Sequence, residues 1–183
     1  MATRWFDAGD KLSWKFRLYR GGEFRVVLVS SETRGPAGGD NWEGGHRVPF
    51  IVRWPGKVQP GSTSHQTISL TDVMATCAAA CGATLPRDAA PDSCNLLPVL
   101  LNGDGTKPAR DCTVQQAFAV LSIRQGPWKY LDHRGSGGNN YDQGELKPFA
   151  LPDTAPTAPG QLYNLETDPG EKMNLYFKYP EIV

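Results

Sequence analysis

The residues of this sequence best suited to chemistry are few, and the four cysteines come first. Cys77 and Cys81 are four residues apart, so on a helix their thiols would share one face, as a pair of metal ligands can. No second Cys or His pair lies near them in the sequence to complete a tetrahedral site. We therefore interpret Cys77 and Cys81 as small apolar residues of a buried helix face. Cys94 and Cys112 add no disulfide framework, so the cysteines do not define the redox compartment.

No other set of residues forms a complete catalytic group. The three histidines lack the serine and aspartate pattern of a hydrolase triad, and the sequence contains neither a phosphate-binding loop nor a zinc-ligand spacing. His46 falls in a turn, which favours a structural role. We therefore predict no catalytic residue in this chain.

The most distinctive stretch is a charged turn followed by an apolar run. Glu43 and Arg47 flank Gly44 and Gly45, which permit backbone angles that a Cβ would forbid. An ion pair between Glu43 and Arg47 could fix this turn, and a structural role is the better interpretation of both charges. Residues 48–54 are too apolar for a half-exposed strand, so they predict a strand buried on both faces.

The elements on either side of this run can be predicted from local signals. Residues 24–29 are rich in β-branched side chains and predict a buried strand of the parallel type. Ser69 and Asp72 form a capping-box pattern at the start of a helix over residues 69–81, and Gly82 ends it. The predicted buried stripe of this helix consists of Val73, Met74, Cys77 and Cys81.

After residue 113 the pattern becomes that of antiparallel strands. The apolar run is long enough for one straight or bulged strand, and a Gly-Pro pair then turns the chain into an alternating strand. The expected elements are a strand at 114–124, a turn at 126–127, a strand at 128–132, an irregular loop at 133–160, a strand at 161–165 and a helix from 174 onward.

Composition excludes some classes of partner. The chain has 183 residues, with 19 Lys and Arg against 19 Asp and Glu, which gives no electrostatic case for a nucleic acid or an anionic membrane. No apolar run approaches the roughly 18 residues of a membrane span. The first residues have no apolar core of a signal peptide. Residues 1–22 interleave basic and aromatic side chains, a pattern that can bind single-stranded nucleic acid, but we interpret them as an ordinary amphipathic segment or a foreign leader.

The run that begins at Glu43 also carries a family resemblance. Residues 43–56, EGGHRVPFIVRWPG, are similar to a signature that type I, formylglycine-dependent sulfatases carry late in their catalytic domain. Further segments resemble the next motifs of that family in the same order: TDVMAT at 71–76, GATLP at 82–86, DSCNLLP at 92–98, IRQGPWKY at 123–130 and LYNLETDPGE at 162–171. The resemblance covers the chain from Trp42 onward and indicates the C-terminal portion of a sulfatase, within the alkaline phosphatase superfamily.

This resemblance implies a fold and a domain order. The fold would be an α/β remnant, namely the end of a sulfatase-type mixed sheet, joined to an α+β C-terminal subdomain with a small antiparallel sheet and a C-terminal helix. Residues 1–41 would be a divergent or shortened N-terminal segment with one strand. Residues 42–110 would be the end of the catalytic domain, and residues 111–183 the antiparallel subdomain.

The implied activity is the hydrolysis of sulfuric esters of sugars or aryl groups. Sulfatases use a formylglycine made from the Cys or Ser of a Cys/Ser-x-Pro-x-Arg motif, and this sequence has no such motif. We therefore expect the chain to be inactive alone, with the missing N-terminal half as a partner. Two alternatives stay open: a non-catalytic α+β binding module, and a fragment of a related phosphodiester or phosphonate hydrolase. The family is expected in the periplasm or outside the cell, and this chain leaves its own compartment unknown.

The resemblance also implies two candidate sites. Sulfatases bind calcium or magnesium through an Asp and an Asn after a strand, and Glu32 and Thr33 occupy those positions here, which would make a degenerate metal site. The position of the family's sulfate-binding lysine is taken by Gly38. In the C-terminal subdomain, His133 and Arg134 precede a glycine-rich loop and could bind an anionic sulfated sugar.

Overall fold

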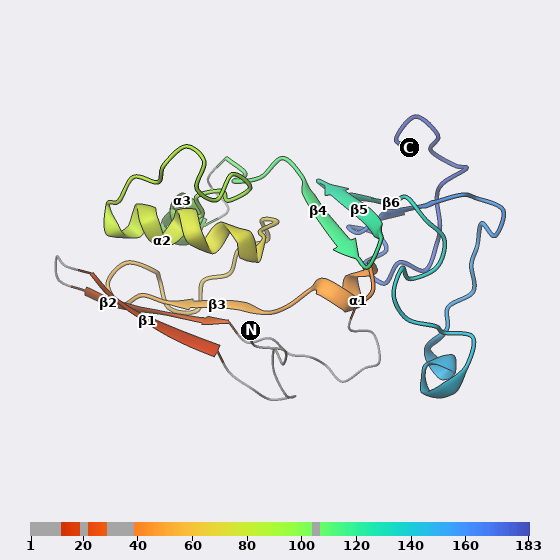
Figure 1. Cartoon of the computed structure of the whole chain (residues 1–183), viewed down its shortest axis with the longest axis horizontal. Coiled ribbons are helices and arrows are strands. Elements are labelled where there is room, and N and C mark those ends of the chain that lie inside the picture. Colours follow the sequence, from red (N-terminus) through yellow and green to blue (C-terminus); the bar gives the residue numbers. More distant parts are fainter. Residues whose placement is uncertain (1–11, 19–21, 29–38, 104–106) are drawn as a thin grey trace. The chain divides into compact units, whose positions relative to one another are not determined.

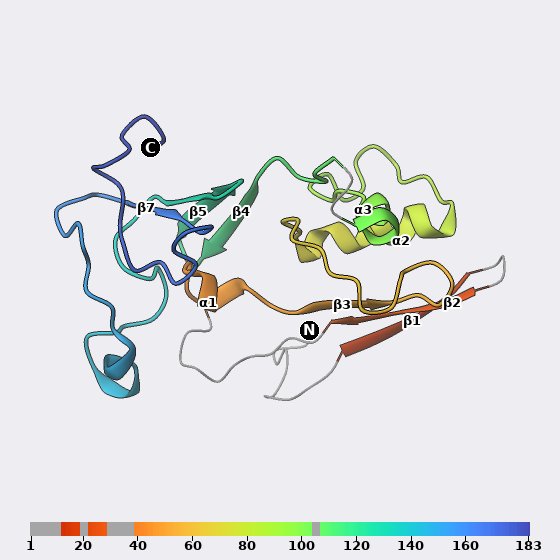
Figure 2. The same cartoon turned by 180° about the vertical axis from the view of Figure 1, so that it is seen from behind.

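The structure is a computed structural model that describes residues 12–18, 22–28, 39–103 and 107–183. The chain divides into two compact units (Figures 1 and 2). The described residues of the first, here the C-terminal unit, are 39–48 and 114–183. Those of the second, here the helical unit, are 12–18, 22–28, 49–103 and 107–113. The three-part division of the sequence into 1–41, 42–110 and 111–183 stays a prediction about domains.

The helical unit contains a sheet of three antiparallel strands. These are β1 (Leu12–Leu18), β2 (Gly22–Leu28) and β3 (Phe50–Arg53), in the order β1-β2-β3. The strand predicted at 24–29 is present as β2, but the prediction of its parallel type is wrong, because β2 runs antiparallel to both neighbours. Its continuous apolar run resembles a parallel strand, but β1 pairs beside it in the antiparallel direction.

Strand β3 is also less buried than the sequence predicted. It spans only four residues and alternates, with Ile51 53% exposed and Arg53 exposed as well. The prediction of a strand buried on both faces is wrong. The half-buried face carries Phe50 and Val52, which line an apolar pocket together with residues of the helices.

The helix start in this unit confirms the capping-box prediction. A 3-10 turn, η1 (Leu70–Asp72), leads into α2 (Val73–Cys81). The backbone N–H of Ser69 donates to Asp72 Oδ2 at 2.8 Å, and Gly82 ends the helix in the left-handed conformation with φ 69°.

The predicted buried stripe of α2 is only partly correct. Met74 and Cys81 are exposed, and the buried residue of the helix is Thr76. The Thr76 hydroxyl is satisfied twice, since it donates to Asp72 O at 2.6 Å and accepts from Leu96 N at 2.9 Å. A threonine can be buried here because both hydrogen bonds replace those it loses to water.

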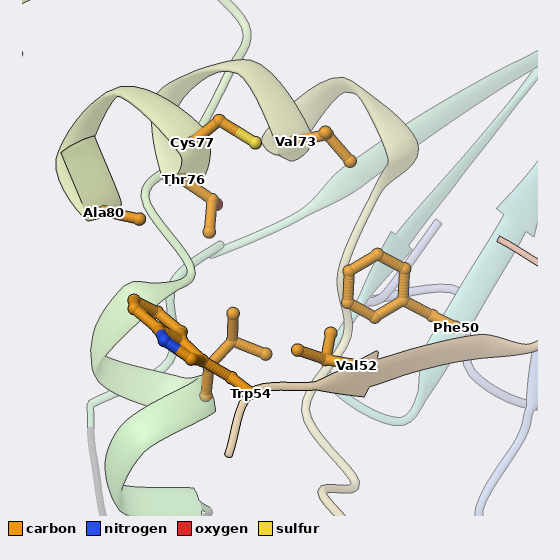
Figure 3. A pocket seen from close by; sticks show the side chains of 8 residues that line it. Phe50, Val52, Trp54, Val73, Thr76, Cys77 and Ala80 are labelled. Carbon is orange, nitrogen blue, oxygen red and sulfur yellow. The ribbon is translucent and has the colours of Figure 1, made fainter. Parts of the chain in front are cut away.

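An apolar pocket lies between α2 and β3 (Figure 3). Its lining comes from β3 and the residue after it, from α2, and from one residue of α3 (Leu97–Asn102): Phe50, Val52, Trp54, Val73, Thr76, Cys77, Ala80 and Leu100. No charged side chain lines this pocket, so it does not suit a sulfate group. Burial raises the pKa of Cys77, which keeps its thiol protonated and unreactive at neutral pH.

A buried ion pair fastens the segment around Arg110 to the start of α2. Asp72 is fully buried and accepts hydrogen bonds from Arg110 Nε at 2.8 Å and from Cys94 N at 2.8 Å. Burial alone would raise the pKa of Asp72, but the Arg110 hydrogen bonds and the backbone donors outweigh it and lower that pKa. Asp72 thus remains ionised inside the unit.

The C-terminal unit is built on a second antiparallel sheet. Its strands are β4 (Thr113–Ala117), β5 (Val120–Gln125), β6 (Trp128–Leu131) and β7 (Gln161–Asn164), in sequence order. The pairing of β5 with β6, in which Ser122 faces Leu131, confirms the predicted antiparallel sheet. The expected single strand at 114–124 is wrong, because a two-residue turn at Phe118 and Ala119 divides it into β4 and β5.

The last residues of the chain do not form the predicted C-terminal helix. They form successive turns in which Asn174 Oδ1 accepts hydrogen bonds from Tyr176 N and Leu162 N, both at 3.1 Å. An asparagine side chain that binds the backbone in this way competes with helix formation. The segment instead covers β6, with the ring of Tyr179 5.2 Å from that of Trp128.

Two smaller elements complete the C-terminal unit. A helical turn, α1 (Glu43–His46), lies in the segment before β3, and a 3-10 segment, η3 (Gly144–Phe149), lies in the long loop between β6 and β7. Among the described residues, no helix is both long and apolar enough to cross a membrane.

Candidate functional site

A completely buried lysine lies at the centre of the C-terminal unit. The alternation of β6 turns Lys129 and Leu131 inward, and Lys129 is 0% exposed. Its Nζ lies 3.1 Å from Glu43 Oε1, 2.9 Å from Glu171 Oε1 and 3.0 Å from His46 Nε2. The Glu171 contact is an ion pair rather than a well-directed hydrogen bond.

The charges around Lys129 compensate one another. Glu43 is also 3.8 Å from Arg124 NH1, and its backbone N–H donates to Glu171 Oε2 at 2.6 Å. Burial raises the pKa of Glu171, against the opposing effect of Lys129. The cluster thus ties α1, β5, β6 and the turn at Glu171 together through groups that would be costly to bury singly.

His46 completes this cluster as a neutral ring. Burial, and then the positive charge of Lys129, lower the pKa of His46 below its ordinary value. A lysine ammonium can only donate, so Nε2 of His46 accepts the hydrogen bond from Lys129. Nε2 of His46 is therefore engaged by a buried group of the unit.

The predicted ion pair between Glu43 and Arg47 is wrong. The carboxylate of Glu43 pairs with Lys129 and Arg124, while Arg47 is exposed and gives only its backbone N–H to Glu43 O, at 2.9 Å. Sequence proximity suggested Arg47 as the partner of Glu43, but the buried partner, Lys129, comes from strand β6.

Both glycines of this turn lie within α1. Position 45 requires glycine because there is no space for a Cβ. A Cβ on Gly45 would lie 2.3 Å from Asp40 O, closer than any side chain permits. The requirement at Gly45 is thus a close approach of two backbone segments, and not a positive φ as the sequence suggested.

Two buried polar residues next to this turn hold the loop after β6. Asp40 accepts from Asn139 N at 2.8 Å, from Asn139 Nδ2 at 2.9 Å and from the Tyr141 hydroxyl. Burial, and then the Asp40 carboxylate, raise the pKa of Tyr141. Asn41 donates its backbone N–H to Ser136 O at 2.7 Å.

His133 belongs to the same network. Its Nε2 is 3.0 Å from Asn41 Nδ2, and its Nδ1 is 3.1 Å from Arg134 O. An amide nitrogen donates and a carbonyl accepts, so Nε2 of His133 accepts from Asn41 and its Nδ1–H donates to Arg134 O. Both ring nitrogens are engaged within the chain, whereas Arg134 is exposed. The assignment of His133 and Arg134 to substrate binding stays a prediction, and the geometry favours Arg134 as the contact and His133 as its support.

Close backbone packing holds this loop against the segment before α1. A Cβ on Gly138 would lie 2.1 Å from Gly39 O, and one on Gly137 would lie 2.8 Å from both His133 Cε1 and Val120 Cγ2. From the other side, Gln161 of β7 donates to the carbonyls of His133 at 2.9 Å and Gly135 at 2.7 Å. The loop that carries Arg134 is therefore fixed at several points.

The described residues do not fit a calcium or magnesium ion. Within residues 39–103 and 107–183, no three His, Cys, Asp or Glu side chains are grouped as a metal site would require. The buried carboxylates are occupied by protein donors, as described for Asp40, Glu43 and Glu171. Glu32 and Thr33, the predicted ligands, lie outside the described residues.

Sequence reasoning missed Lys129 and Glu171 as parts of the site. Both lie in segments that resemble family motifs, but neither has the spacing of a catalytic pair. One signal was available: in the alternating strand Trp128–Leu131, Lys129 shares a face with the apolar Leu131, which a surface lysine would not.

Comparisons with known proteins define the class. The family model described as Sulfatase matches residues 29–83. An N-acetylgalactosamine-6-O-sulfatase of Bacteroides thetaiotaomicron is 36% identical over 168 residues, which are 91% of this chain and 28% of that protein. Human arylsulfatase A is 35% identical over 144 residues, which are 75% of this chain and 27% of that protein. These matches identify the chain as a portion of a sulfatase.

Solved structures agree with this assignment. One, from work on glycosaminoglycan metabolism by Bacteroides thetaiotaomicron, matches 77% of this chain and 28% of that chain with a TM-score of 0.61 and 38% identity. A second, in complex with its substrate D-glucosamine-2-N,6-O-disulfate, matches with a TM-score of 0.51 and 22% identity, which shows a shared fold alone. The chain thus spans little more than a quarter of the length of the relatives it matches.

Proposed function

We propose that this chain is the C-terminal part of a sulfatase that hydrolyses sulfate esters of sugars, and that its C-terminal unit helps to bind the sulfated substrate. The ordered motifs and the sulfatase relatives support the family. Relatives named for N-acetylgalactosamine 6-sulfate favour a sulfated sugar over a simple aryl sulfate. The chain itself supplies no formylglycine motif, so the nucleophile would come from another part of the enzyme, as would most ligands of a calcium or magnesium ion.

The observation that carries this proposal is the rigid support beneath Arg134. Asp40 and Asn41, both almost fully buried, fix the loop after β6 through side-chain and backbone hydrogen bonds. The guanidinium of Arg134 is left exposed on that fixed loop. An arginine held in this way binds a tetrahedral oxyanion well, because its planar donors can contact two oxygens at once. Fixing the loop in advance also reduces the entropy lost on binding.

Titration of the labelled chain by NMR tests this function. N-acetylgalactosamine 6-sulfate should shift the backbone amide signals of residues 133–141, and the unsulfated sugar should shift them much less. Arg134→Ala should weaken binding of the sulfated sugar about tenfold, the loss expected of one charge-assisted contact. Arg87→Ala removes another exposed arginine, in the helical unit, and serves as the matched control.

Two results would count against the proposal. Equal effects of Arg134→Ala and Arg87→Ala would show that binding follows net charge alone. Tighter binding of N-acetylgalactosamine 6-phosphate than of the 6-sulfate would favour the related phosphodiester or phosphonate hydrolases.

A further inference from the structure

Phe118 is placed in a way that does not benefit the fold. It occupies the two-residue turn between β4 and β5 with φ 51°, in the left-handed region that favours glycine, and its side chain is 79% exposed. A large side chain at positive φ is strained, and an exposed ring gains little from burial. Glycine or asparagine would meet the same backbone requirement more easily.

The turn that carries Phe118 adjoins the loop that supports Arg134. A Cβ on Gly39 would be 3.9 Å from Phe118 Cε2, and Gly39 is also the residue against which Gly138 packs. Val120, the first residue of β5 after the turn, accepts a hydrogen bond at its backbone oxygen from Asn41 Nδ2 at 3.2 Å. A Cβ on Gly137 would lie 2.8 Å from Val120 Cγ2. The turn, the segment before α1 and the loop after β6 therefore meet.

We propose that Phe118 is a stacking platform for the sugar ring of the sulfated substrate. This inference rests on the proposed function and adds the group that recognises the sugar itself. The face of a phenyl ring is apolar and carries a partial negative charge, so it suits the C–H face of a pyranose and not the sulfate. Recognition would then be shared, with Arg134 binding the anion and Phe118 binding the carbohydrate.

If Phe118 is such a platform, replacing it by glycine should raise the stability of the chain and weaken its binding of the sulfated sugar. Phe118→Gly removes the strained φ and should raise Tm by about 2 °C. The same substitution should weaken binding of N-acetylgalactosamine 6-sulfate about fivefold. Phe118→Tyr keeps an aromatic face and should bind as the wild type does. Inorganic sulfate, which has no ring to stack, should bind all three proteins equally.

Each alternative result is informative. If Phe118→Gly binds the sulfated sugar as tightly as the wild type, the platform is overturned, while an intact Arg134 dependence would leave the proposed function standing. If Phe118→Gly weakens inorganic sulfate equally, or lowers Tm, the residue acts on the fold and the platform is also overturned. Phe118→Asn, a second residue that tolerates positive φ, guards against an effect peculiar to glycine. Failure of the wild type to bind the sulfated sugar would overturn the platform and the proposed function together.

Discussion

At the scale of single residues, the buried charges of the C-terminal unit are the features with the largest energetic consequence. Lys129 has no access to water, and among the described residues its Nζ is paired with the carboxylates of Glu43 and Glu171 and hydrogen-bonded to His46. Replacing all the charged residues of such a cluster by apolar residues would change the stability little. Removing one of them destabilises the fold, because the remaining buried charges lose their partner.

Lys129→Ala should therefore lower the free energy of unfolding by about 3–5 kcal/mol, because it leaves the buried Glu171 without its cation and Glu43 with only the more distant Arg124. The measurement is urea unfolding of the purified chain. Lys172→Ala, which removes an exposed lysine from the residue next to Glu171, should change that free energy by less than about 0.5 kcal/mol. A loss for Lys129→Ala no larger than for Lys172→Ala would contradict the account of the cluster.

At the scale of elements, the start of α2 shows how local and distant signals combine. Ser69 and Asp72 cap the helix through contacts three residues apart, which a sequence pattern can reveal. The same carboxylate also binds Arg110 and Cys94 N, which join α2 to segments much later in the chain. One aspartate thus serves both the helix end and the packing of the helical unit.

Asp72→Asn should destabilise the chain by about 3 kcal/mol at pH 7, because it breaks a buried ion pair. The pKa of Asp72 is lower in the folded chain than its ordinary value of 3.8. Its charged form therefore stabilises the fold above that ordinary value, and this stabilisation is lost as the pH falls through the folded pKa. Thermal unfolding from pH 7 to pH 2 should show the difference between wild type and variant shrinking at the acidic end. Asp88→Asn, at an exposed aspartate, is the control and should change little at any pH.

At the scale of the whole molecule, two compact units share one chain that corresponds to little more than a quarter of its sulfatase relatives. The helical unit presents an apolar pocket without a charged lining residue, and the C-terminal unit presents a fixed loop with an exposed arginine. Among the described histidines, His46 uses its Nε2 and His133 uses both ring nitrogens within the fold, so neither Nε2 is placed as a free general base.

Purified chain should therefore not hydrolyse a chromogenic aryl sulfate in the presence of calcium, because the sequence lacks the formylglycine motif. A complete sulfatase in the same assay is the positive control. Turnover that persists through purification and disappears on substitution of a residue of this chain would show that the chain carries a nucleophile of its own.

The sequence by itself determined the features that depend on neighbours a few residues away. The capping box at Ser69, the helix stop at Gly82 and the hairpin after Gly126 follow from short-range hydrogen bonds and backbone angles, so their residue types could be recognised directly. The ordered motifs likewise indicated a portion of a sulfatase, which the relatives confirm.

Only the tertiary structure decided which distant groups meet. The partners of Lys129, the approach of Gly138 to Gly39 and the antiparallel pairing of β2 with β3 all join residues from separate segments. Whether a charge is buried, and which group balances it, depends on the folding of the whole unit and not on nearby residues. Sequence spacing therefore pointed Glu43 to Arg47, whereas the fold placed it against Lys129.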